Sequence, residues 1–105
     1  MSAMAKRIFS EVKRTEHERM PWHFVYILQL SNGSFYTGYT GNLEQRIKQH
    51  ELGEVASTKG KRPIELIYFE ACLFKRDALA REKYLKSTYG KQRLRKRLKH
   101  WFLKQ

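Results

Sequence analysis

Two short stretches on either side of an Asn-Gly pair decide the fold: Phe24-Val-Tyr-Ile-Leu-Gln-Leu30 and Phe35-Tyr-Thr-Gly38. Both are rich in β-branched and aromatic residues, and the first is too short to form a helix of its own. Asn32-Gly33 separates them and can adopt the positive φ angles that a tight hairpin turn needs. The sequence therefore predicts two antiparallel strands, over residues 24–30 and 35–39.

A helix and a third strand are expected after this hairpin. Asn42, followed by Gln45 three residues later, has the pattern of a helix N-cap, and Gly53 is a typical C-terminal stop. A polar segment from Gly53 to Pro63 then leads to a third apolar run, Ile64-Glu-Leu-Ile-Tyr-Phe-Glu70. We therefore expect a small α/β (α+β) domain, in which helices flank a three-stranded, mainly antiparallel sheet.

A helical pattern runs from about Arg76 to the end of the chain. In its first half, Ala78, Glu82 and Leu85 share one face. Gly90 is expected to interrupt the helix, and a second apolar stripe follows at Leu94, Leu98, Trp101 and Phe102. Residues 1–20 show no clear period, so we expect an N-terminal arm at 1–20 and one domain at 21–105.

The charge of the chain is strongly positive and unevenly placed. Its 105 residues contain 22 Lys and Arg against 10 Asp and Glu, a net charge of +12, and beyond residue 74 the only acids are Asp77 and Glu82. Such a field attracts polyanions, of which nucleic acid is the commonest, although a solubilising surface without a partner is the alternative. The residues expected to bind nucleic acid lie opposite the last apolar stripe: Lys91, Arg93, Arg95, Lys96, Arg97 and Lys99.

Several classes of protein do not fit the sequence. No run approaches the roughly 18 apolar residues of a membrane span, and the N-terminus lacks the apolar core of a signal peptide. One cysteine, Cys72, excludes an internal disulfide and a cysteine-based zinc cluster. We therefore expect a cytoplasmic, anion-binding domain that has neither a membrane partner nor a small-molecule cofactor.

Three motifs in a fixed order resemble the GIY-YIG nuclease domain over roughly residues 22–95: Val25-Tyr26-Ile27, Tyr36-Thr37-Gly38, and Asn42-Leu-Glu-Gln-Arg46-Ile-Lys-Gln-His50. The resemblance is strongest to small standalone bacterial members, related to the N-terminal nuclease module of the excinuclease C subunit. It implies an endonuclease that hydrolyses phosphodiester bonds in nucleic acid, with DNA favoured over RNA and with structured or damaged DNA among the candidate substrates. It also implies one bound Mg²⁺ or Mn²⁺ ion.

The resemblance further implies a role for each matching residue. Tyr36 would take the proton from the attacking water, Tyr26 would orient the nucleophile, and Arg46 would steady the phosphate. Glu82 would be the single carboxylate ligand of the metal. His50 would assist proton transfer or position the water. With an ordinary pKa of about 6.5, His50 is also a rival to Tyr36 as the base.

Three departures from the family pattern support a second hypothesis. Thr37 replaces an apolar residue, Tyr39 stands where lysine is common, and residues 83–105 contain no Asn to match the one that many members carry after the metal glutamate. The alternative is therefore a nucleic-acid-binding module that kept the fold but cleaves weakly or not at all. A third hypothesis is a basic amphipathic C-terminal helix that binds an acidic membrane or protein surface.

Overall fold

The three predicted strands form one antiparallel sheet in the computed structural model, which describes residues 21–104. The central strand β1 (His23–Gln29) lies between β2 (Phe35–Thr40) and β3 (Glu65–Cys72). The hairpin turns at Asn32-Gly33, where Gly33 has a φ of 85°. The predicted fold class is thus confirmed, whereas the expected arm at residues 1–20 lies outside the described residues.

The strand register sorts the β1 side chains onto the two faces of the sheet. Tyr26 pairs with Gly38, and Leu28 pairs with Tyr36. Because side chains alternate along a strand, Tyr26, Leu28 and Tyr36 lie on one face and Ile27 lies on the other. The first face, with Tyr26, packs against the helix at residues 43–51, through Leu43 and Ile47. The second face, with Ile27, packs against the helices at residues 75–86 and 88–97, through Ala78, Leu85 and Leu94.

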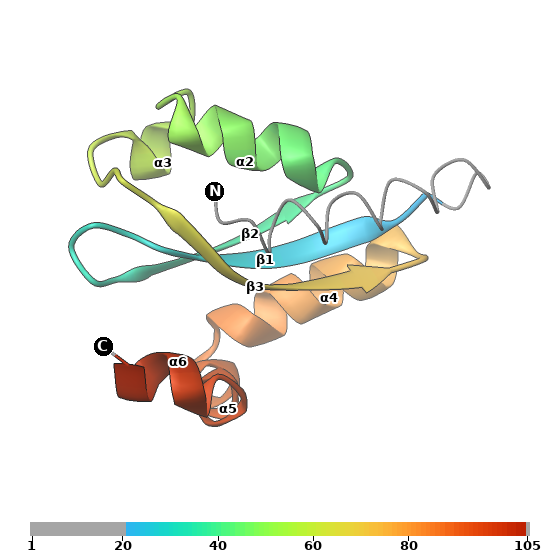
Figure 1. Cartoon of the computed structure of the whole chain (residues 1–105). Helices are drawn as coiled ribbons and strands as arrows, with labels where there is room; N and C mark the ends of the chain where they lie inside the picture. Colours follow the sequence, from blue (N-terminus) through green and yellow to red (C-terminus); the bar gives the residue numbers. More distant parts are fainter. Residues whose placement is uncertain (1–20, 105) are drawn as a thin grey trace.

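Two helices cover the first face, which is the upper one in Figure 1. Helix α2 (Leu43–Glu51) begins as predicted, because the Asn42 side chain accepts a hydrogen bond from the backbone N–H of Gln45 at 3.1 Å. The segment expected to be only polar contains a further short helix, α3 (Ala56–Lys59). Four residues are too few to show a helical period in a sequence, which explains why α3 was missed.

Helix α4 (Lys75–Lys86) covers the second face as predicted, but the expected interruption at Gly90 is wrong. The helix ends instead at Ser87, whose ψ of 159° is extended. The Ser87 side chain caps the next helix, α5 (Thr88–Arg97), by accepting a hydrogen bond from the backbone N–H of Gly90 at 3.0 Å. Gly90 is buried inside α5. Its lack of a side chain lets the helix approach the carbonyl group of Tyr84.

The last apolar stripe is divided between two helices rather than lying on one. Helix α5 ends before Leu98, and α6 (Lys99–Lys104) begins directly after it. The turn brings Trp101 and Phe102 back toward the hairpin, where the indole N–H donates to the Gln29 side chain at 2.9 Å and Phe102 packs edge-on against Phe35. Within residues 21–104, no helix is long and apolar enough to cross a membrane.

Candidate active site

Four of the five predicted catalytic side chains meet between the sheet and α2. Tyr26 from β1 and Tyr36 from β2 lie with their ring centres 6.2 Å apart, and the His50 ring lies 5.1 Å from that of Tyr36. The register places both tyrosines on one face, and the spacing of four residues places Arg46 and His50 on one side of α2. We call Tyr26, Tyr36, Arg46 and His50 the tyrosine cluster.

His50 is fully buried, and both of its ring nitrogens have partners. Its Nε2 lies 2.8 Å from the Tyr26 hydroxyl, and its Nδ1 lies 2.7 Å from Oγ1 of Thr58. The Thr58 hydroxyl is directed to the carbonyl group of Val55, so its oxygen accepts from Nδ1–H. His50 Nε2 therefore accepts a hydrogen bond from the Tyr26 hydroxyl, so the hydrogen bonds run in one direction from Tyr26 to His50, from His50 to Thr58 and from Thr58 to Val55.

Burial keeps both members of the Tyr26–His50 pair uncharged near neutral pH. Desolvation, assisted by the nearby Arg46 charge, lowers the pKa of His50 to about 4. Desolvation also raises the pKa of Tyr26 to about 12, although a hydrogen bond with Arg46 acts in the opposite direction. The pair is thus a neutral, fixed support rather than a group that titrates around pH 7.

Arg46 and Tyr36 form the accessible side of the tyrosine cluster. Both are half-buried, whereas Tyr26 and His50 have no exposed surface. Burial lowers the pKa of the Arg46 guanidinium, but hydrogen bonds and charge interactions with Tyr26 and Tyr36 together outweigh burial, so the pKa is raised. Arg46 also donates to Oε1 of Gln49 at 3.0 Å. A ligand that approaches the cluster therefore meets the Tyr36 hydroxyl and a permanent positive charge.

Two further residues shape the cluster: Thr58, which had no distinct signal in the sequence, and Gly38, which ends the Tyr36-Thr37-Gly38 motif. Thr58 lies in a polar segment, where a surface loop is the usual interpretation, yet it is fully buried against His50. Gly38 lies under the Tyr26 ring, and a Cβ at this position would stand 2.5 Å from both Cζ and the hydroxyl of Tyr26. Thr58 thus orients His50, and Gly38 leaves room for the Tyr26 ring.

Glu82 lies on α4, the helix that packs on the face of the sheet opposite α2. Its carboxylate is half-buried and lies 3.5 Å from the Lys86 ammonium group. Helix α4 also contacts β2, the edge strand that carries Tyr36. Within residues 21–104, no three His, Cys, Asp or Glu side chains form a group that could hold a metal.

One carboxylate can still fit the implied metal. Mg²⁺ is commonly held by one or two carboxylates and completes its shell with water and substrate phosphate oxygens. Glu82 supplies one such carboxylate. Its partner Lys86, four residues further along the helix, has a mostly exposed side chain, so a divalent ion can take the place of the Lys86 ammonium group. The donor set therefore fits a hard, hydrated cation.

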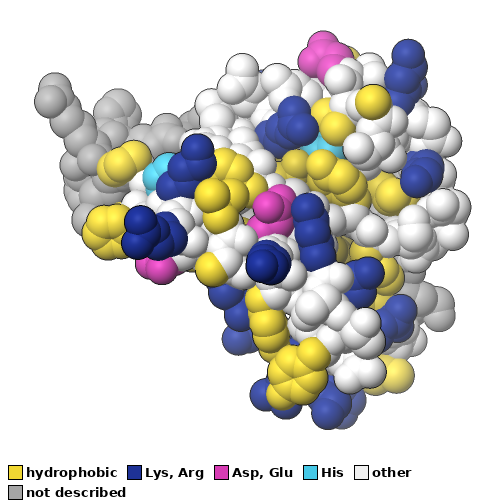
Figure 2. Space-filling model, turned by 180° about the vertical axis from the view of Figure 1, so that it is seen from behind, with side chains coloured by type: hydrophobic (Ala, Val, Ile, Leu, Met, Phe, Trp, Pro, Cys, Tyr) yellow, Lys and Arg dark blue, Asp and Glu magenta, His cyan; other side chains and the backbone are white. Residues whose placement is uncertain are grey.

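The predicted nucleic-acid-binding residues are all exposed, along α5 and at the start of α6. Arg95 has a second role, because its guanidinium stacks 4.8 Å from the ring centre of Phe102 and so helps to hold α6. Figure 2 shows basic and hydrophobic side chains interleaved over one face of the molecule, where acidic side chains are sparse. This surface suits a polyanion.

The sequence is similar to a family model and to several known proteins. The family model described as the GIY-YIG catalytic domain matches residues 22–99. A UPF0213 protein of Clostridium perfringens is 47% identical over 73 residues, which cover 69% of this chain and 78% of the relative. A UPF0213 protein of Staphylococcus aureus is 44% identical over 75 residues, or 70% of this chain and 90% of the relative. These names state no activity.

One solved structure is also similar. The solution NMR structure of the UPF0213 protein BH0048 from Bacillus halodurans is 38% identical in sequence, with a TM-score of 0.46. The match covers 70% of this chain and 81% of that chain.

Proposed function

The chain belongs to the GIY-YIG catalytic domain family, which has a nuclease fold, and we propose that it is a divalent-metal-dependent endonuclease that hydrolyses phosphodiester bonds in DNA. The observation that carries this proposal is the tyrosine cluster. Its accessible members, Tyr36 and Arg46, lie on a buried series of hydrogen bonds that runs from Tyr26 through His50 to Thr58. A buried hydrogen-bond network whose members are all satisfied makes the groups it supports rigid, and here these are the two side chains that a substrate would meet.

Arg46 and Tyr36 are the groups that would contact the substrate. The planar guanidinium of Arg46 can hold two phosphate oxygens at once, and its charge counters the negative charge that grows on phosphorus oxygens in the transition state. The Tyr36 hydroxyl lies beside it and would take the proton from the attacking water. Both groups reach the surface, as substrate contact requires.

Tyr26 and His50 would act as positioning residues. Since neither has exposed surface, neither can reach an attacking water directly, which favours Tyr36 over His50 as the base. Neutral His50 accepts a hydrogen bond from the Tyr26 hydroxyl, so the lone pairs of the Tyr26 oxygen remain for Arg46. This arrangement fixes the orientation of the guanidinium before substrate arrives, which lowers the cost of reorganisation during the reaction.

Glu82 would hold the Mg²⁺ or Mn²⁺ ion. When bound, a divalent ion supplies charge that offsets the phosphate oxygens and the leaving group. The exposed basic residues of α5 would bind the backbone of the same nucleic acid and set its affinity rather than its sequence preference.

The test is cleavage of a panel of linear, branched and single-stranded DNAs and RNAs, with Mg²⁺ or Mn²⁺ and with EDTA. We expect metal-dependent cutting of DNA that is abolished in Arg46→Ala and in Glu82→Gln. Lys48→Ala on α2 and Asp77→Asn on α4 are matched controls, since both are exposed and change the charge equally. Cutting by Glu82→Gln at the wild-type rate would contradict the metal site.

Tyr39 favours the binding-only alternative. Tyr39 stands where lysine is common in the family. Its hydroxyl lies 2.8 Å from Nδ1 of His23, and the Lys75 ammonium group lies 5.7 Å from its ring centre. A binding-only module predicts salt-sensitive DNA binding with a steep log–log slope and no metal-dependent product. Measured binding without any product across the panel would therefore select this alternative over the endonuclease.

A further inference from the structure

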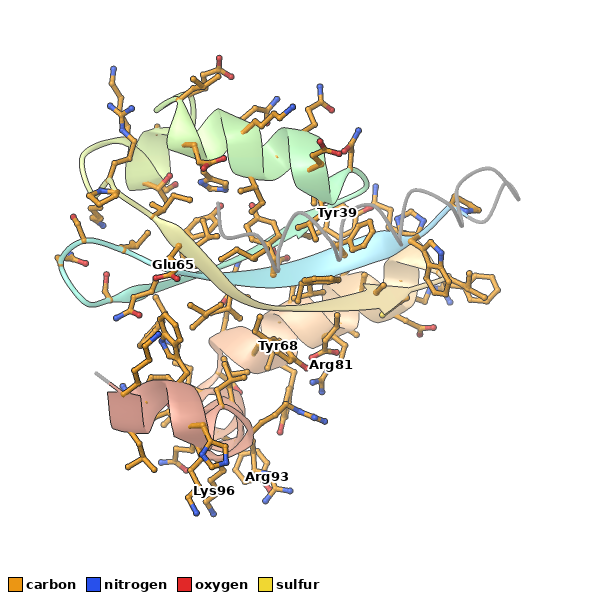
Figure 3. The ribbon with its side chains drawn as sticks, in the orientation of Figure 1. Tyr39, Glu65, Tyr68, Arg81, Arg93 and Lys96 are labelled. Carbon is orange, nitrogen blue, oxygen red and sulfur yellow. The ribbon has the colours of Figure 1, made fainter. Side chains whose placement is uncertain are left out.

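A cavity of about 500 Å³ lies on the face of the sheet opposite the tyrosine cluster. Strand β3 contributes Tyr68, helix α4 contributes Arg81 and Tyr84, and helix α5 contributes Arg93, Lys96 and Arg97. Figure 3 shows Tyr68 and Arg81 beside each other under the sheet, with Arg93 and Lys96 farther from the sheet, on α5. The proposed function uses neither Tyr68, Arg81 nor Tyr84.

Of the four cations around the cavity, Arg81 is paired with Glu70, and the charge of Arg97 also helps to lower the pKa of that carboxyl group. Arg81 donates two hydrogen bonds to the Glu70 carboxylate, at 2.9 and 2.7 Å, and Tyr68 donates a third to the same group. Within residues 21–104, Arg93, Lys96 and Arg97 make no such ion pair. The cavity therefore carries an unbalanced positive charge, and this charge favours an anionic ligand.

The remaining walls suit a flat, apolar group. Leu85 and Leu94 are buried at the base, and the Tyr84 ring lies 4.9 Å from the Arg81 guanidinium. Small-molecule sites commonly enclose about 300–1,000 Å³, so this cavity has room for far more than a phosphate ion. A ligand that fills it would combine an anion with an aromatic ring.

We propose that this cavity binds one nucleotide unit, either a free nucleoside monophosphate or a nucleotide within a chain. The phosphate contacts Arg93, Lys96 and Arg97, and the base stacks on a tyrosine ring, as bases do in single-strand binding sites. The choice of a nucleotide over another aromatic anion rests on the proposed function. The anion site shares the exposed basic residues of α5 with the proposed function, but it uses neither Tyr36 nor Arg46, which lie on the other face of the sheet.

The test is an NMR titration of the full-length, ¹⁵N-labelled protein with deoxyadenosine monophosphate. We expect shifts at the amides of Tyr84 and of residues 93–97, and none along α2. Lys96→Gln should weaken binding about tenfold, the cost of one charged hydrogen bond. Lys83→Gln is the matched control, because Lys83 is exposed on α4, carries the same charge and does not line the cavity.

Three further ligands identify what the cavity recognises. Inorganic phosphate and deoxyadenosine should each bind more weakly than the nucleotide, because each offers only half of the contacts. A 5′-phosphorylated tetradeoxynucleotide that binds more tightly than the monophosphate, and that loses affinity in Lys96→Gln, would identify a nucleotide within a chain. Equal affinity for the tetradeoxynucleotide and for deoxyadenosine monophosphate would identify the free nucleotide as the ligand.

The outcomes separate this proposal from the proposed function. Unshifted cavity amides at saturating nucleotide, with equal tetranucleotide affinity in the wild type and Lys96→Gln, would overturn the cavity proposal even if the protein cuts DNA. Cavity binding by a protein that never cuts DNA would support the nucleotide site and overturn the nuclease.

Discussion

The aromatic ring of Tyr26 occupies the space that a side chain at Gly38 would need. The two residues face each other across β1 and β2, and a Cβ on Gly38 would lie 2.5 Å from the Tyr26 hydroxyl oxygen. This contact explains the glycine at the end of the Tyr36-Thr37-Gly38 motif by packing rather than by backbone angle. It also links the motif to His50, which the Tyr26 hydroxyl contacts from the other side.

Gly38→Ala should therefore displace the Tyr26 ring. A methyl group forced into a packed site costs about 1–3 kcal/mol, which urea denaturation measures as a lower free energy of unfolding. Gly41→Ala is the matched control, since a Cβ there meets no atom within 4 Å. Equal stability of the two variants would contradict the packing role of Gly38.

Thr58→Val tests the far end of the hydrogen-bond chain. Valine has a similar shape but cannot accept from Nδ1–H of His50, so a buried donor is left without a partner. The expected loss is about 1–3 kcal/mol in the free energy of unfolding. Thr88→Val, at an exposed position on α5, should change stability far less. Unchanged stability in Thr58→Val would show that the hydrogen bond between His50 and Thr58 does not stabilise the fold.

The stability of the protein should decrease in acid because of His50. Its pKa is lowered to about 4 in the folded state, from 6.5, so the unfolded chain binds the proton first. Stability is therefore full above pH 6.5, falls as the pH decreases, and is lowest below about pH 4. Between pH 7.5 and pH 5 the expected loss from this group is about 2 kcal/mol.

Urea denaturation at the two pH values measures this loss. His50→Gln should reduce the difference between the two pH values, whatever its effect on stability at pH 7.5. His100→Gln, at an exposed position, should leave the difference as it is in the wild type. The same pH dependence in wild type and His50→Gln would assign the effect to another group.

Gly90→Ala tests the junction between α4 and α5. Alanine is normally the better helix residue by about 1 kcal/mol, but here a Cβ would overlap the backbone carbonyl of Tyr84, which cannot move aside without shifting α4. We expect a net loss of about 1–3 kcal/mol, or a Tm roughly 4–20 °C lower. Gly60→Ala has open space around its Cβ and is the control. A higher Tm in Gly90→Ala would contradict the close helix contact.

Local signals were enough to predict the elements whose own residues define them. Asn32-Gly33 defines the hairpin, Asn42 starts α2 with its own side chain, and the apolar spacing of Ala78 and Leu85 identifies the buried face of α4. Gly90 misled the prediction because a glycine within a helical pattern is equally expected at a helix end and at a close helix contact. Only the position of Tyr84 distinguishes the two.

The order of the motifs identified the members of the tyrosine cluster, since strand register and helix period follow from short-range rules. The tertiary structure decided what each member can do. Burial removed Tyr26 and His50 from contact with a substrate, and the fold brought Thr58 onto His50. Likewise, the fold places α4, the helix that carries Glu82, on the face of the sheet opposite α2, and the cavity forms only where β3, α4 and α5 meet. Burial and long-range contacts depend on how distant elements pack, and no local pattern records that packing.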